Sequence, residues 1–107
     1  MTTVLPDLRT SVREERVDAL RAFRFTERQA RFLVTVLIHS GVFVPRQYRT
    51  FAGIVHGQKV RDFVRKLVGR GYATVITPGA FHRGRLFHVQ YRPLYEAIGE
   101  PHNPIRG

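Results

Sequence analysis

The amino-acid sequence predicts one α+β domain that is mostly α-helical. Capping signals and apolar periodicity mark five helices, and a pair of β-branched segments follows the fourth of them. Gly or Pro separates most neighbouring segments. The 107 residues suffice for one domain, and the 43% of hydrophobic residues suffice for a compact core. We expect an N-terminal helical arm over residues 1–24, a folded domain over 25–99 and a flexible tail over 100–107.

The composition excludes several classes of protein. The chain has no Cys, which rules out a disulfide scaffold, a thiol nucleophile and a Cys-based zinc site. Its longest apolar run, Phe32 to Ile38 with Thr35 inside it, is far shorter than the roughly 18–20 residues of a membrane span. The N-terminus lacks the hydrophobic region of a signal peptide. We therefore expect a cytoplasmic protein with no membrane partner.

The first predicted helix covers about residues 12–23, because Ser11-Val-Arg-Glu14 has the pattern of a capping box. Its apolar side is thin and consists of Val12, Val17, Leu20 and Phe23. We expect such a helix to pack at the edge of the domain or on a second subunit, outside the core. It is our candidate for a homodimer contact, and the alternative is a brace across the core of its own chain.

The second predicted helix begins after the capping box Thr26-Glu-Arg-Gln29 and is ended by Gly41. The β-branched Val36 and Ile38 would also suit a strand, but a segment of this length between a cap and a Gly favours a helix. Apolar residues occupy nearly every face, which is typical of a helix surrounded by protein. They are Ala30, Phe32, Leu33, Val34, Val36, Leu37 and Ile38. We predict that this is the central core helix.

Two further helices follow. The segment 42–44 is long enough only for an edge strand or a tight connection, and Pro45 suits the first position of a two-turn helix over 46–52. We expect Tyr48, Phe51 and Ala52 to point inward from it. After a turn over 53–57, apolar residues recur at helical spacing from residue 58 to 70, where Gly71 ends the helix. These residues are Val60, Phe63, Val64, Leu67 and Val68.

The C-terminal part predicts a β-hairpin and a short helix. Residues 72–77 and 85–91 are suited to strands, and the turn-rich segment 78–84 joins them. Residues 93–98 form a last short helix that Gly99 ends. A three-helix core, a β-hairpin, an extra N-terminal helix and a short C-terminal helix are the layout of a winged helix-turn-helix.

The charge is concentrated where that layout would meet a polyanion. The chain carries +10 overall, and residues 44–71 hold seven basic residues against one acid. A DNA major groove about 12 Å wide admits one α-helix with an apolar inner face and a polar outer face. The helix over 58–70 fits that description. Its predicted outward residues are Gln58, Lys59, Arg61, Asp62, Arg65, Lys66, Gly69 and Arg70, and the first six of them are candidates for DNA contacts. The alternative is a helix whose polar face is only solvated.

Three other groups of residues are candidates for DNA contacts. His82, Arg83 and Arg85 lie at the tip of the predicted hairpin, where they would reach a minor groove or flanking phosphates. Arg46, Gln47 and Arg49 on the preceding short helix are candidates for phosphate contacts. His56, just before the long basic helix, is a further phosphate candidate.

The sequence resembles the winged-helix superfamily of bacterial DNA-binding proteins from Phe25 to Gly99, about 70% of the chain. It is most similar to MarR-like transcriptional regulators and to replication-relaxation proteins of plasmids and mobile elements. The resemblance is carried by FTERQARFLVTVL, VPRQYRTFAGI, VRDFVRKLVGRGYATVI and RLFHVQYRPLYEAIG. It implies that residues 58–66 match a DNA-reading helix and residues 82–85 a wing. MarR-like regulators have a long C-terminal dimerisation helix, which this sequence lacks.

The sequence predicts no catalytic or metal chemistry. Its five His residues lack metal-ligand spacing, neither of its two Ser residues has a nucleophile-elbow context, and GIVHGQK lacks the ending of a phosphate-binding loop. Its eight carboxylates show no acid/base pairing. We therefore expect neither an enzyme nor a protein with a cofactor, a metal or a small-molecule ligand.

The resulting hypothesis is a sequence-specific double-stranded-DNA-binding protein, a small bacterial or mobile-element transcriptional regulator that associates with the nucleoid. One alternative is a winged-helix adaptor that binds a protein partner in a replication, mobile-element or defence complex. RNA binding is disfavoured, because Phe81 is the only obvious aromatic residue near a basic tip that could stack on unpaired bases.

Overall fold

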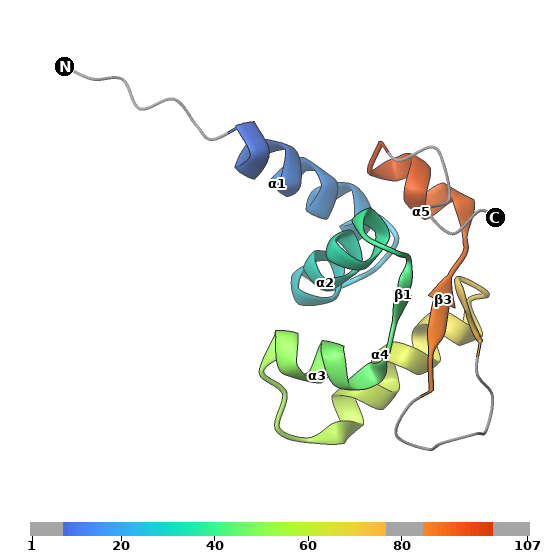
Figure 1. Cartoon of the computed structure of the whole chain (residues 1–107). Helices are drawn as coiled ribbons and strands as arrows, with labels where there is room; N and C mark the ends of the chain where they lie inside the picture. Colours follow the sequence, from blue (N-terminus) through green and yellow to red (C-terminus); the bar gives the residue numbers. More distant parts are fainter. Residues whose placement is uncertain (1–7, 77–84, 100–107) are drawn as a thin grey trace.

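The computed structural model describes residues 8–76 and 85–99, and only the backbone of residues 8–12. Within this part the protein is α+β and mostly helical, as predicted, with five helices and one three-stranded antiparallel sheet (Figure 1). The elements are α1 (Leu8–Arg21), α2 (Glu27–Ile38), β1 (Val42–Phe43), α3 (Pro45–Ala52), α4 (Gly57–Gly69), β2 (Ala73–Val75), β3 (Phe87–Val89) and α5 (Arg92–Ala97). The predicted tail over 100–107 lies outside the described residues.

The sheet has the order β1-β3-β2, with β3 in the centre. Its antiparallel pairs place His88 of β3 opposite Val42 on one side and opposite Thr74 on the other. The predicted edge strand and the pairing of the two hairpin strands are therefore confirmed, and the predicted tip over 78–84 lies outside the described residues. The strands are shorter than predicted, but hairpin hydrogen bonding continues past them, from Ile76 N to Leu86 O (2.7 Å) and from Gln90 N to Tyr72 O (2.9 Å).

Helix α2 is the central core helix, as predicted. Its capping box is complete, because the Thr26 hydroxyl accepts from Gln29 N (3.1 Å) and the Gln29 amide oxygen accepts from Thr26 N (3.0 Å). The helix ends at Ile38, and the N–H of Gly41 then donates back to Val36 O (2.8 Å) with φ at +74°. Six of the twelve residues in α2 are buried.

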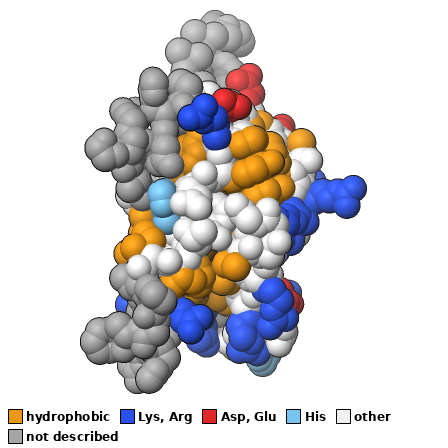
Figure 2. Space-filling model, turned by 90° about the vertical axis from the view of Figure 1, so that its right-hand side faces the viewer, with side chains coloured by type: hydrophobic (Ala, Val, Ile, Leu, Met, Phe, Trp, Pro, Cys, Tyr) orange, Lys and Arg blue, Asp and Glu red, His pale blue; other side chains and the backbone are white. Residues whose placement is uncertain are grey.

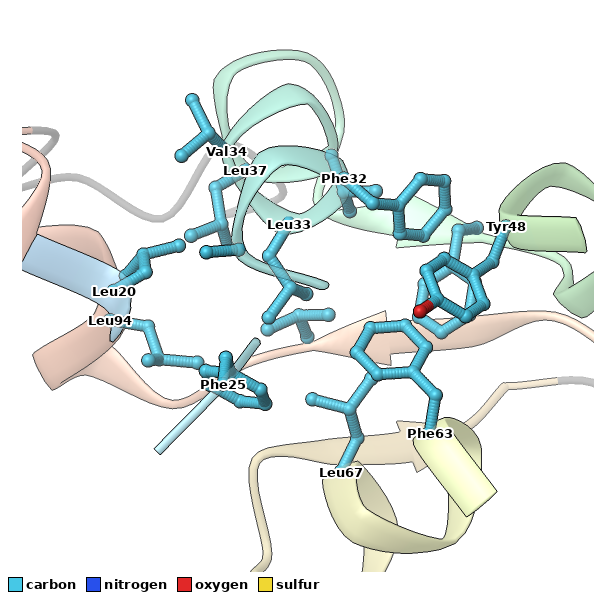
Figure 3. Packing of buried hydrophobic residues seen from close by; sticks show 14 of the residues in the cluster. Leu20, Phe25, Phe32, Leu33, Val34, Leu37, Tyr48, Phe63, Leu67 and Leu94 are labelled. Carbon is cyan, nitrogen blue, oxygen red and sulfur yellow. The ribbon is translucent and has the colours of Figure 1, made fainter. Parts of the chain in front are cut away.

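The core is formed around α2 by side chains from every helix and from the sheet (Figure 3). Aromatic rings make up much of it: the ring of Tyr48 lies 5.1 Å from that of Phe32 and 4.2 Å from that of Phe63, between centroids. Leu20 of α1 and Leu94 of α5 close the opposite end (Figure 3). The cluster therefore joins the N-terminal helix, the central helices and the hairpin into one body.

Helix α1 belongs to this core, so our expectation of a helix outside it was wrong. Val17 is 1% exposed and Leu20 is fully buried. The thin apolar stripe of α1 is enough to bury it, because α2 is apolar on nearly every side and α1 covers one of those sides. The helix also begins before Ser11, which therefore does not cap it. Within residues 13–21 no large apolar side chain is exposed, which favours the intramolecular brace over the dimer contact.

Two other inward predictions were wrong. Phe51 of α3 is 48% exposed, because Tyr48 already fills the space facing Phe63, and the Phe51 ring only borders Phe32 at 5.5 Å. Val68 of α4 is 42% exposed, because it lies at the margin of the apolar side on which Phe63 and Leu67 are buried. Among the described helices, the longest has 14 residues, and none is apolar and long enough to cross a membrane.

Candidate nucleic-acid interface

The turn between α3 and α4 fixes how α4 is presented. Helix α3 ends at Gly53, which has φ at +65°. The guanidinium group of Arg49 donates to the carbonyl oxygens of Ile54 (3.3 Å) and Val55 (2.9 Å), so it braces the turn from within. We predicted Arg49 as a phosphate contact; the structure shows it exposed and with this structural contact, and the phosphate contact stays a prediction.

Helix α4 presents one side to the core and the other to solvent, as predicted. Val60, Phe63 and Leu67 are buried against the core cluster. The predicted outward side chains Gln58, Lys59, Arg61, Asp62 and Arg65 are all exposed. They occupy the first turns of the helix and form the group that we call the α4 outer face.

Hydrogen bonds order part of the α4 outer face. The Gln58 amide group donates to a carboxylate oxygen of Asp62 (2.7 Å), and its oxygen accepts from the Arg61 guanidinium (3.0 Å). Arg65 lies 3.9 Å from the same carboxylate oxygen. These side chains are exposed, so the contacts mainly restrict rotamers and contribute little to stability. They present Gln58 and Arg61, which have the bidentate geometry for adenine and guanine, as one unit.

Lys66 does not join this group, although we predicted it on the outward side. Its ammonium group donates to Arg24 O (3.2 Å) and to the amide oxygen of Gln29 (2.8 Å), and it lies 5.3 Å from the centre of the Phe25 ring. Burial, with a smaller contribution from the charge of Arg70, lowers the pKa of Lys66 below its ordinary value. Lys66 therefore ties α4 to the start of α2.

The remaining predicted residues fall into four situations. Arg46 is exposed, and among the described residues neither it nor Lys59 forms a hydrogen bond or ion pair. The Gln47 amide oxygen accepts from Val44 N (2.8 Å) and so caps α3. His56 is the exposed N-cap residue of α4, and its side chain makes no capping bond. His82 and Arg83 lie outside the described residues.

Arg85 precedes β3, is exposed, and lines one groove together with Arg61 and Arg65 of α4. The groove runs between α4 and the hairpin and has a volume of about 460 Å³. Figure 2 shows Lys and Arg side chains gathered at the lower end of the molecule around hydrophobic atoms. The structure thus brings a residue of the predicted wing beside the predicted reading helix.

Acidic residues are distributed differently from this basic group. Among the described residues, Asp62 is the only acid on α3, α4 or the hairpin, whereas α1 carries Glu14, Glu15 and Asp18. A polyanion approaching α4 would therefore meet an excess of positive charge. In the part of the chain that the structure describes, no three His, Asp or Glu side chains come together as a metal site would need.

The chain matches no protein-family model, no curated protein and no solved structure.

Proposed function

We propose that this protein is a winged helix-turn-helix protein that binds double-stranded DNA sequence-specifically and acts as a transcriptional regulator. The observation that supports this most is the α4 outer face, where Gln58 and Arg61 are exposed, hydrogen-bonded to each other and mounted on a helix with a buried opposite side. A helix of this kind fits a major groove with its first turns against the base edges.

Positive charges around α4 supply the sequence-independent part of the binding. Arg46 and Lys59 are exposed and available to phosphates, and Arg65 and Arg85 line the groove between α4 and the hairpin. Neutralised phosphates release counterions, so about six such contacts give a slope of log K against log salt of roughly −5. His82 and Arg83 are proposed to extend these contacts from the wing.

The test is a fluorescence-anisotropy titration of the full chain against duplexes selected from a random pool and against unselected duplexes. We expect the selected duplexes to bind at least about a thousandfold more tightly at the same salt concentration, which is the lower end of the usual range of specificity ratios. Equal affinity for both sets would contradict sequence-specific binding. A palindrome among the selected duplexes would indicate binding as a dimer.

Arg61→Ala tests the reading residue directly. We expect it to weaken binding to the selected duplex by about 1–3 kcal/mol and to relax the preference at one base pair. The matched control is Arg21→Ala, which removes the same charge from an exposed position on α1, away from the α4 outer face. Equal losses in both variants would show that net charge, and not base reading by Arg61, drives the binding.

A further inference from the structure

The groove between α4 and the hairpin has an apolar floor that phosphate binding does not require. Val60 and Phe87 are buried at its base, and Val64 and Val75 are half-buried in its walls. Val68 is 42% exposed in the same groove. Apolar side chains that line a groove open to solvent suit the apolar residues of a protein partner better than they suit phosphates.

The shape of this floor matches a helix. Val60, Val64 and Val68 recur every four residues on α4, so they form a straight row about 12 Å long, which is about two turns of a second helix. Amphipathic helices bind such grooves through apolar residues at i, i+3 or i+4, and i+7. The volume of about 460 Å³ leaves room for several apolar side chains.

The charge around the groove determines which charge a partner helix must carry. Arg61, Arg65 and Arg85 line it, and no acidic residue is among its described lining residues. A partner with acidic residues beside its apolar stripe would pair with these arginines, whereas a basic partner would be repelled. Charge complementarity therefore specifies an acidic occupant.

We infer that the groove docks an acidic amphipathic helix of a partner protein. Its apolar stripe lies on the row of Val60, Val64 and Val68, and its carboxylates pair with the arginines. Because Arg61 and Arg65 also belong to the α4 outer face, the docked helix and DNA exclude each other. This competition, unlike the docking itself, rests on the proposed DNA-binding function.

The probe is a synthetic helix-forming peptide with Leu at positions i, i+4 and i+7 of two turns and Glu at most other positions. The control is a peptide of identical composition in which the leucines do not share a face. We expect the patterned peptide to bind the full chain at least about tenfold more tightly than the scrambled one, the factor that corresponds to about one lost apolar anchor. Equal affinity of the two peptides would overturn the docking proposal.

Val68→Gln identifies the site. Val68 is partly exposed, so the variant should fold, and we expect it to weaken peptide binding about tenfold while leaving duplex affinity unchanged. The matched control is Val55→Gln, because Val55 is 74% exposed in the turn before α4 and outside the groove. Equal peptide binding by both variants would overturn the assignment to this groove.

The last arm of the test separates docking from DNA binding. Added patterned peptide should release bound duplex from the full chain, and it should do so less well from Val68→Gln. If the peptide binds at the groove but the protein has no affinity for any duplex, the docking proposal stands and the proposed DNA function fails. If duplex binds and the peptide binds without displacing it, mutual exclusion is overturned.

Discussion

The two ends of this molecule use arginine in different ways. At the end formed by α1, α2 and α5, Arg31 makes a bidentate pair with Glu14 (2.9 Å) and also bonds to Glu27 (2.8 Å). These carboxylates hold the pKa of Arg31 above its ordinary value, and Arg31 in turn lowers the pKa of Glu14. At the end formed by α3, α4 and the hairpin, arginines outnumber acids, and several stay open to solvent.

The difference shows that residue type does not decide the role of a basic side chain. Arg31 and Arg49 hold elements together, because carboxylates or carbonyl groups surround them. Arg46, Arg61 and Arg65 face outward with at most one carboxylate nearby. The first end therefore acts as a framework, and the second end is the candidate binding surface.

The largest expected effect compares two glycines, one at each end. Gly41→Ala should lower the free energy of unfolding by about 3 kcal/mol, because the residue has a positive φ and its added methyl group would collide with the Tyr95 hydroxyl. Gly53→Ala should cost only about 1 kcal/mol, because its φ is also positive but nothing lies within 4 Å of the added carbon. Urea denaturation measures both. Equal losses would contradict a crowded framework end.

Neighbouring residues on α4 sharpen the comparison further. Lys66→Gln should lower the free energy of unfolding by about 1 kcal/mol through its lost hydrogen bonds and leave duplex affinity unchanged. Arg65→Gln should leave the free energy of unfolding nearly unchanged. It should weaken binding to all duplexes several-fold, because it removes a phosphate contact. Urea denaturation and duplex titrations on both variants provide the measurement. A loss of duplex affinity in Lys66→Gln would refute its purely structural role.

A smaller effect is expected from the acid within the basic surface. Asp62→Asn should raise affinity for every duplex about two- to fivefold at low salt, because a repulsive charge is removed, and the gain should shrink as salt screens it. The Asn oxygen can still accept from Gln58. Glu15→Gln on α1 is the matched control and should change duplex affinity very little. If Asp62→Asn weakened binding instead, Asp62 would be a contact residue.

A further expected effect concerns alkaline pH at the framework end. Burial raises the pKa of the Tyr95 hydroxyl from 10.0 to about 12. Because this pKa is higher in the folded than in the unfolded chain, the neutral hydroxyl stabilises the fold below pH 10, and this contribution is lost between pH 10 and about 12. Denaturation curves across that range should show a steeper decline for the natural chain than for Tyr95→Phe. Identical declines would contradict a buried, hydrogen-bonded hydroxyl.

The sequence predicted most of the fold because its strongest signals are local. Thr26 and Gln29 form a capping box whatever the rest of the chain does, and Pro45 and Gly53 bound α3 through their own backbone preferences. Periodicity in the same way identified the buried side of α4. The order of these elements was enough to predict the hairpin beside α4.

The errors arose where a long-range contact decides the outcome. Lys66 is on the polar side of α4 by spacing, but the carbonyl of Arg24 and the amide of Gln29 lie within its reach only in the folded chain. Val17 is buried because α1 packs on the apolar surface of α2. Val68 stays partly exposed and lines the apolar groove between α4 and the hairpin. None of these contacts follows from residue spacing along one helix.

The central position of β3 has a consequence for hydrogen exchange when the protein binds a partner. This strand is hydrogen-bonded on both edges, and its last residue, Val89, both donates to Gly41 O (2.8 Å) and accepts from the Tyr95 hydroxyl. Amide protons of a strand clamped in this way exchange with solvent only through large-scale opening of the structure. Because Phe87 of this strand also lines the groove beside α4, an occupant of that groove should slow hydrogen exchange of the β3 amide protons.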